Sequence, residues 1–330
     1  MSVLIKGTGV AGLTLATELT RRGIKVALVD SAATIGQGAS HYAGGMLAPY
    51  CEREATEDIV LTLGLQATDW WEAALPGSVS RNGTLVLAPS RDLGDLNRFA
   101  SRTRGFEWVN EAQIAALEPA LAGRFRRGLF FAQEAHLDPR QALEGLWRAL
   151  LRKGVSFHLG DVPKPDVSTF SMVVDCTGAA AIAQQPALRG VRGEMIYLHT
   201  PDVSLSRPIR LLHPRHPIYI VPRSDHRFMV GATMIEAEDN GPISARSLME
   251  FLNAAYTLHP AFGEARLIET GVGIRPAFAD NIPRVMEIAD GLAIAGMHRH
   301  GFLLSPAMAQ QAADQIEQTL ATHLKPRLVS

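Results

Sequence analysis

Three glycines near the start of the chain, Gly7, Gly9 and Gly12, have the spacing of a loop that binds a dinucleotide. They stand in the hexapeptide GTGVAG. The first glycine permits a sharp turn, the second leaves room for a pyrophosphate to approach the backbone, and the third lets a helix pack closely on a strand. The pattern alone is weak because glycine is common, so the flanking residues decide between a dinucleotide site and an ordinary tight turn.

The residues around this hexapeptide read as strand, turn, helix and strand. The apolar run SVLIK precedes it, and LTLATELTRRG follows it with a helical stripe that ends near Gly23. The next run, IKVALVD, is a second buried strand that ends in Asp30, which is placed to accept hydrogen bonds from ribose hydroxyls. The N–H groups and dipole at the helix N-terminus favour phosphates. We therefore expect a dinucleotide site, with an empty βαβ crevice as the alternative.

Three further stretches are placed to contact a bound dinucleotide. The segment GQGASHYAGGMLAP (36–49) is rich in small residues that let backbone amides reach a phosphate or a flat ring, although a flexible loop has the same composition. The segment MVVDCTGAA (172–180) reads as a buried strand that returns to the nucleotide site at Thr177 and Gly178, although a plain strand and turn explain it equally well. The segment GMHRHGFLLSPAMAQQ (296–311) opens a helix whose dipole would face an electron-rich carbonyl or an anion.

Composition excludes several classes of function. A chain of 330 residues with 47% hydrophobic and 20% charged residues is ordinary for a two-domain globular enzyme. A formal net charge of −1 gives no electrostatic case for nucleic acid or an anionic membrane. We find no signal-peptide pattern and no apolar stretch of about 20 residues that could span a bilayer. Cys51 and Cys176 give neither a disulfide framework nor metal-ligand spacing. We expect a cytoplasmic protein without a metal.

Hydrophobic periodicity predicts the elements that must position these segments. Helices are expected at 59–75, 139–154, 244–258 and 305–324. Strands are expected at 83–88, 154–160, 171–178, 193–199, 218–223, 227–233 and 291–296. The middle strands alternate apolar and polar residues, whereas the early and late strands are apolar throughout. That contrast predicts an antiparallel sheet inserted into a parallel sheet that is covered on both faces.

Taken in order, these stretches resemble the D-amino-acid oxidase superfamily of FAD-dependent oxidoreductases, and within it the glycine oxidases of the thiamine biosynthesis (ThiO) type. The segment SHYAGGML (40–47) is similar to the family block S-x-x-A-A-G-M-L. The segment YIVPRSDHRFMVGATM (219–234) resembles the substrate-domain block, and GVGIRPAFADNIP (271–283) the arginine block A-G-L-R-P. The segment GMHRHGFLLSP (296–306) resembles the closing block G-H-x-R-N-G-I-L-L-A-P. The resemblance extends over nearly the whole chain.

The resemblance implies an α/β fold in which an α+β substrate domain is inserted. We expect a discontinuous Rossmann-type FAD-binding domain at 1–80, 131–188 and 271–330. The inserted substrate-binding domain, built on an antiparallel sheet, would occupy 81–130 and 189–270. Family resemblance also implies a homo-oligomer.

Matched residue by residue, the resemblance implies that four side chains meet the substrate. Arg275 would hold its carboxylate through a bidentate fork, and Tyr219 would add a hydroxyl to the same carboxylate. Arg299 would lie close to the substrate at the flavin edge, and Met234 would line the pocket. Without the resemblance, an arginine before a proline reads as a surface residue, and Tyr219 and Met234 read as core.

The resemblance also implies non-covalently bound FAD with contacts along the whole site. The first loop and second strand would bind the diphosphate and ribose, the small-residue segment would follow the diphosphate and the ring, and the closing block would wrap the isoalloxazine. The residues concerned are Gly7, Gly9, Val10, Ala11, Gly12, Asp30, Ser31, Ala39, Ser40, Gly44, Gly45, Met46, Val162, Thr177, Gly178, Met297, His298, His300, Gly301, Phe302 and Leu303.

The chain departs from the family at two places. Met297, His300 and Phe302 stand where the closing block has His, Asn and Ile. Met297 cannot replace the lost hydrogen bonds, whereas His300 can offer one, so the surroundings of the ring are altered. The segment DVPKPDVSTF (161–170) is short where the family has a strand meander, which makes Val162, placed against the adenine, the weakest of the transferred contacts.

The implied reaction is oxidative deamination of glycine, sarcosine or a small D-amino acid. Hydride would pass from Cα of the deprotonated amine to flavin N5, with oxygen reduced to peroxide, and the imine would hydrolyse to an oxo acid or pass to a thiazole synthase. No Asp, Glu or Lys falls within the tyrosine, arginine or closing blocks, so no side-chain general base is expected.

Three other classes of protein are alternatives to this reaction. The first is an FAD-dependent D-amino-acid or opine dehydrogenase, as a subunit of a larger complex, that passes electrons to a carrier. The second is a non-catalytic flavin-binding protein, although such a scaffold has no use for a carboxylate clamp. An NAD-dependent dehydrogenase is disfavoured because the second and closing blocks would then have no role.

Overall fold

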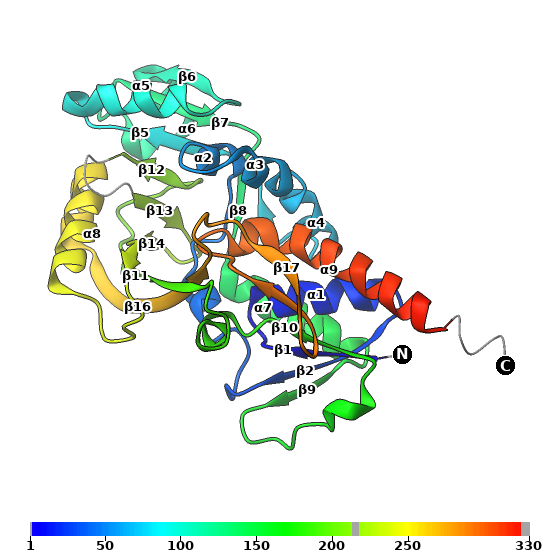
Figure 1. The fold of residues 1–330 in the computed structure, drawn as a ribbon. Coiled ribbons are helices and arrows are strands. Elements are labelled where there is room, and N and C mark those ends of the chain that lie inside the picture. The colour runs from blue at the N-terminus through cyan, green and yellow to red at the C-terminus, as the bar shows by residue number, and fades with distance from the viewer. Residues whose placement is uncertain (1, 213–217, 325–330) are drawn as a thin grey trace.

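The computed structural model describes residues 2–212 and 218–324, which form two lobes, each built on a large sheet (Figure 1). The sheet nearer the N-terminus has six strands in the order β17-β18-β10-β1-β2-β9. All neighbours are parallel except the edge strand β17, which runs antiparallel to β18. Its strands are β1 (Ser2–Lys6), β2 (Lys25–Asp30), β9 (Ser156–Leu159), β10 (Met172–Asp175), β17 (Arg284–Ile288) and β18 (Gly291–Ala295).

Three helices pack on one face of this parallel sheet. They are α1 (Val10–Arg21), α7 (Pro139–Arg152) and α9 (Gly301–Leu324), which share one apolar core with inward residues of the strands. The opposite face carries only a small cluster of strand residues beside Phe170. The strand residues of this second face are buried as well, but a loop residue, Phe170, packs against them where helices cover the first face.

The first loop explains why each of its outer glycines is needed. Gly7 has a φ of 101°, a backbone conformation that residues with a side chain rarely adopt. A Cβ on Gly12 would lie 2.0 Å from the carbonyl oxygen of Gly7, so helix α1 can approach strand β1 only if residue 12 lacks a side chain. Thus the predicted strand–turn–helix unit is present at the predicted residues.

The second large sheet has nine strands and is antiparallel except where β5 runs parallel to β12. Eight of its strands follow the order β15-β11-β14-β13-β12-β5-β7-β6, and β16 pairs with β11. Helix α8 (Ala245–Leu258) covers one face, where Phe251 and Leu258 are fully buried (Figure 1). The strands are β5 (Thr84–Leu87), β6 (Glu107–Asn110), β7 (Arg127–Phe131), β11 (Arg189–His199), β12 (Ile209–Leu211), β13 (Ile218–Pro222), β14 (Arg227–Gly231), β15 (Ile235–Glu236) and β16 (Arg266–Ala277).

The remaining elements are a small three-stranded sheet and several short helices, of which two pack against strands β6 and β7 of the second large sheet. The sheet consists of β3 (Met46–Leu47), β8 (Ala135–Leu137) and β4 (Val79–Ser80). The short helices are α2 (Pro49–Arg53), α3 (Asp58–Gly64), α4 (Ala67–Ala74), α5 (Leu93–Ser101) and α6 (Glu111–Leu117). Within residues 2–212 and 218–324, no helix combines the length and apolar character needed to cross a bilayer.

The predicted α/β fold with an inserted, mainly antiparallel sheet is confirmed, with local differences. The helix expected at 59–75 is two helices, α3 and α4, and the helix expected from residue 305 begins earlier, at Gly301. Strand β16 crosses residue 271, where we placed a domain boundary, because it pairs with β11 along almost its whole length. The two-domain division stays a prediction, and its ranges include residues 213–217 and 325–330, which lie outside the described residues.

Replacing Gly12 by alanine tests the packing of α1 on β1. The new Cβ would lie 2.0 Å from a backbone oxygen that cannot move aside cheaply, so we expect the free energy of unfolding to fall by about 1–3 kcal/mol. Urea unfolding of the two proteins measures the loss. Gly94→Ala in α5 is the matched control, because nothing lies within 4 Å of its Cβ position. Equal stability of Gly12→Ala and the native protein would contradict this packing role.

Candidate active site

A cavity of about 350 Å³ lies between the two large sheets. The carboxyl ends of β1, β2, β10 and β18 form one wall, and β11, β13, β14 and β16 form the other. The crevice outside the carboxyl ends of parallel strands is the usual ligand site of an open α/β sheet. The cavity therefore lies where the sequence predicts the dinucleotide.

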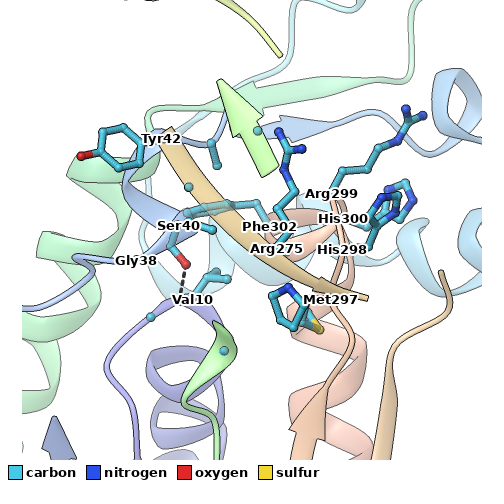
Figure 2. A pocket seen from close by; sticks show the side chains of 18 of the residues that line it. Val10, Gly38, Ser40, Tyr42, Arg275, Met297, His298, Arg299, His300 and Phe302 are labelled. Atoms are coloured by element: carbon cyan, nitrogen blue, oxygen red, sulfur yellow. Dashed lines mark hydrogen bonds between the residues drawn. The ribbon is translucent and has the colours of Figure 1, made fainter. Parts of the chain in front are cut away.

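At the nucleotide end, the first turn of α1 faces the cavity. Gly9, Val10 and Ala11 line it, and the N-cap residue Gly9 has no side chain to cap the helix. The hydroxyl of Ser40 accepts a hydrogen bond from the Val10 backbone N–H at 3.1 Å, which ties the small-residue segment to the glycine loop (Figure 2). Uncapped N–H groups at a helix N-terminus, beside a glycine with no side chain in the way, are suited to a pyrophosphate.

Asp30 holds the glycine loop in place. One of its carboxylate oxygens accepts hydrogen bonds from the backbone N–H and the hydroxyl of Thr8, both at 2.7 Å. The other accepts the N–H of Ala32 at 3.0 Å. A carboxylate has about four acceptor positions, so one remains for a ribose hydroxyl. The ribose contact stays a prediction, but the carboxylate has a structural role that the sequence did not indicate.

Most of the residues expected to contact FAD are brought together by the fold and line this one cavity. Three expected residues do not line it. Gly12 faces β1, Ser31 is exposed beyond the strand, and Val162 is 49% exposed in the shortened loop after β9. Those lining it are Gly7, Gly9, Val10, Ala11, Asp30, Ala39, Ser40, Gly44, Gly45, Met46, Thr177, Gly178, Met297, His298, His300, Gly301, Phe302 and Leu303.

Arg275, Arg299, Tyr219 and Met234 meet at the other end of the cavity. Figure 2 shows the guanidinium groups of Arg275 and Arg299 on the same side of the cavity. Arg299 lies 3.5 Å from the sulfur of Met234, which is 54% exposed at the edge of the cavity. All four residues that the resemblance assigned to the substrate therefore line one end of one cavity, although their contacts with a substrate stay predictions.

The guanidinium of Arg275 has no anion beside it. It lies over Gly193, where a Cβ would clash with it, and its Nη1 donates a hydrogen bond to the carbonyl of Thr233 at 2.9 Å. Among residues 2–212 and 218–324, no carboxylate lies within 4.0 Å of it. Burial and the nearby charge of Arg299 lower the pKa of Arg275 to about 10. A cation in such surroundings is stabilised by an incoming anion.

Glu52 of α2, a residue that sequence analysis did not single out, places a carboxylate at the centre of this end. It is buried, and Oε2 lies 2.5 Å from Nη2 of Arg299 and 3.4 Å from Nδ1 of His300. Burial alone would raise the pKa of Glu52, but the charges of Arg299 and Arg210 outweigh burial and lower it to about 2. Glu52 is thus ionised at neutral pH and is a poor proton acceptor.

A buried arginine on β12 completes the cluster. Arg210 donates a hydrogen bond to the Tyr219 hydroxyl at 2.7 Å, and that hydroxyl donates to Oε1 of Glu52 at 3.1 Å. The guanidinium lies between the rings of Phe99 and Tyr219, 5.1 and 5.0 Å from their centroids. Because a phenol has one proton, Tyr219 can donate to a substrate carboxylate only by releasing Glu52. The role expected for Tyr219 therefore involves a competition that the sequence did not show.

Both missed residues have sequence surroundings that point to the surface. Glu52 stands in CEREATED, a dense run of charges that is typical of a solvated helix face. Arg210 alternates with Ile209 and Leu211, as the exposed positions of a half-buried strand do. Only the pairing of Arg210 with Tyr219 across β12 and β13 brings it to the cavity. No local signal in the sequence could have found either residue.

The three residues that depart from the family's closing block are buried in the fold. Met297 is buried in the core. The rings of Phe302 and Trp71 stack with their centroids 5.6 Å apart, and the Phe302 backbone carbonyl accepts the Trp71 indole N–H at 2.9 Å. His300 is buried, and in the described part of the chain neither of its ring nitrogens has a hydrogen-bond partner. Burial lowers the pKa of His300 to about 4, so it is neutral at pH 7.

A second buried carboxyl group lies behind the cluster. Oε1 of Glu134 accepts the backbone N–H of Cys51 at 2.7 Å, one residue before Glu52. Burial raises the pKa of Glu134 to about 7, and the charge of Glu52 adds to the rise. Glu134 therefore keeps its proton at a pH where an exposed glutamate has lost it.

The pH dependence of stability tests this assignment. Between pH 4.5 and about 7 the folded protein holds a proton on Glu134 that the unfolded chain releases. The free energy of unfolding should therefore fall by about 3 kcal/mol as pH rises through this window. Urea unfolding between about pH 5 and 8 measures the slope for the native protein and for Glu134→Gln, which lacks this titration. Parallel pH profiles for the two proteins would contradict a raised pKa at Glu134.

Comparison with known proteins agrees with this geometry. Residues 2–315 match the family model described as FAD dependent oxidoreductase. A Rhizobium etli protein named "Putative thiamine biosynthesis oxidoreductase ThiO" is 63% identical over 316 residues, covering 96% of each chain. The crystal structure of glycine oxidase from Geobacillus kaustophilus, 25% identical, superposes with a TM-score of 0.81 over 96% of this chain and 94% of that one. A bifunctional protein ThiO/ThiG from Trichormus variabilis is 26% identical over 95% of this chain and 52% of its own length.

Proposed function

Because the chain belongs to the family of FAD dependent oxidoreductases, we propose that it deaminates a small amino acid by FAD-dependent oxidation. The substrate is glycine, sarcosine or a small D-amino acid, and the products are an imine or its oxo acid and hydrogen peroxide. The similarity to ThiO and to glycine oxidase supports this choice. The observation that carries this proposal is that the guanidinium of Arg275 lies on the wall of the cavity without a carboxylate to neutralise it among the described residues.

The residues of the chain would bind and orient the substrate, while FAD supplies the hydride acceptor when it is bound. Arg275 binds the carboxylate through the donors that Thr233 leaves free, and Arg299 lies beside it. Met234, at the edge of the cavity, covers the substrate from solvent. The low pKa of Glu52 makes it unsuitable as a base, so the amine proton leaves to solvent before the oxidation.

The remaining parts of the proposal concern acceptors, partners and location. Oxygen is the electron acceptor, and the imine is consumed by a thiazole synthase, since some relatives are named as bifunctional ThiO/ThiG proteins. We also propose a homo-oligomer in the cytoplasm. Two buried, unpaired cysteines, Cys51 and Cys176, are consistent with a reducing compartment.

Anaerobic addition of glycine, sarcosine and D-alanine to the FAD-bound protein tests the reaction. We expect one of them to bleach the flavin absorbance, because its carboxylate pairs with Arg275. Fast recovery in air with release of peroxide would establish an oxidase, whereas slow recovery would show a dehydrogenase that uses another acceptor. Absence of bleaching with every amine would refute the proposed substrate class.

Replacing Arg275 by alanine tests the carboxylate site. The substitution removes the guanidinium that binds the anion, so we expect substrate affinity to weaken by about 2–5 kcal/mol, while bound FAD is retained. The concentration dependence of anaerobic flavin bleaching gives the affinity. Arg148→Ala on the exposed face of α7, where Arg148 pairs with Glu144 of the same helix, is the matched control. Unchanged affinity in Arg275→Ala would show that the carboxylate binds elsewhere.

A further inference from the structure

The charged side chains that line the described cavity are distributed unevenly. Asp30 lies at the nucleotide end, whereas Glu52, Arg210, Arg275 and Arg299 lie at the substrate end. The substrate end thus presents three guanidinium groups and one carboxylate. An unbalanced surplus of this size would attract molecules with two or more carboxylates as readily as a simple amino acid.

Glu52 neutralises the charge of one of these cations before a substrate binds. Its Oε2 lies 2.5 Å from Nη2 of Arg299, and its Oε1 lies 3.6 Å from Nη1 of Arg210. Oε2 and both Arg299 Nε and Nη2 are inaccessible to solvent, so this contact is sealed within the wall of the cavity. Arg299 is therefore already paired before a substrate enters.

A second carboxylate pairs with Arg210 from outside the cavity. Oε2 of Glu54 lies 3.5 Å from Nη2 of Arg210, and the Glu54 side chain is 15% exposed. Glu54 does not line the cavity. Arg210 is held between two carboxylates and two aromatic rings, and it too is compensated. Of the three guanidinium groups, Arg275 alone lacks a carboxylate within the described residues.

The other ionisable groups nearby do not alter this balance at neutral pH. Burial lowers the pKa of His298 to about 3 and that of His300 to about 4, so both are neutral. Glu134, whose pKa burial raises to about 7, lies behind Cys51 and outside the cavity wall, so its partial charge at neutral pH is not presented to a ligand. The substrate end is therefore balanced except for one positive charge.

We propose that Glu52 is the specificity-determining residue that restricts this site to substrates with a single carboxylate. By pairing with Arg299 and Arg210 it leaves one guanidinium for one carboxylate, and it places a fixed negative charge where a second substrate carboxylate would lie. Like charges brought together in a site of low polarity oppose binding strongly. The inference rests on the proposed function, since it assumes that Arg275 binds the substrate carboxylate.

Two ligands of nearly equal size and different charge test this role. Malonate carries two carboxylates, and its monoamide, malonamate, carries one; neither has an amine to be oxidised. Dissociation constants come from the perturbation of the bound-flavin absorbance in the FAD-loaded protein. We expect the native protein to bind malonamate at least about tenfold more tightly than malonate.

Glu52→Gln preserves the shape of the side chain and removes its charge. We expect the ratio of the two dissociation constants to shift toward malonate by at least about tenfold, because the charge of Arg299 is then no longer neutralised and attracts the second carboxylate. Glu54→Gln is the matched control: it removes the same charge from the same arginine outside the cavity, and the ratio should change by less than about twofold. An unchanged ratio in Glu52→Gln would overturn the proposal.

A second variant, with the opposite expected effect on the ratio of dissociation constants, keeps the proposal testable if Glu52→Gln does not fold. Arg210→Met removes a cation and leaves Glu52 in place with Arg299, so we expect discrimination against malonate to increase. A ratio that falls or stays constant in Arg210→Met would count against the role of Glu52.

If the native protein binds neither malonamate nor acetate, the carboxylate site of the proposed function itself fails. Binding of malonamate with an unaltered ratio in every variant would refute only the inference drawn from Glu52.

Discussion

A buried carboxylate must be compensated where it lies, and in this protein that requirement joins segments from across the chain. Glu52 on α2 contacts Tyr219 on β13, Arg210 on β12 and Arg299 before α9. Removing one partner from a buried ion cluster generally costs several kcal/mol, because the remaining charge stays buried without compensation. This end of the cavity is therefore shaped largely by one electrostatic constraint, and the positions of Arg210 and Arg299 follow from it.

The nucleotide end depends on a steric constraint instead. Helix α1 approaches β1 so closely that the backbone of Gly7 occupies the space that a side chain at residue 12 would need. The approach directs the N-terminal turn of the helix at the cavity, where Ser40 and Asp30 fix the loop from two sides. One end of the cavity is thus built from backbone groups and the other from charged side chains, which matches a site that holds a diphosphate and a small zwitterion together.

How much of this could be predicted depended on whether the signal was local. The glycine loop and the second strand are continuous patterns, and the structure has them at the predicted residues. The α/β fold and the position of Arg275 on the cavity wall followed from family resemblance over long blocks. Glu52 and Arg210 escaped because their roles come from pairing between β12 and β13 and from burial of a charged run, which only tertiary structure reveals. The contact expected of Val162 did not appear, since the short loop after β9 leaves this residue exposed and away from the cavity.

The contact between Trp71 and Phe302 has a consequence for observing the protein in solution. The indole of Trp71 stacks on the Phe302 ring and donates its N–H to the Phe302 carbonyl, directly behind the loop that lines the cavity. Indole emission responds to its hydrogen-bond partner and is quenched when a flavin lies near. The protein thus carries a fluorophore at the back of its own cavity, and Trp71 contributes a quenchable part of the emission of its four tryptophans without any introduced label.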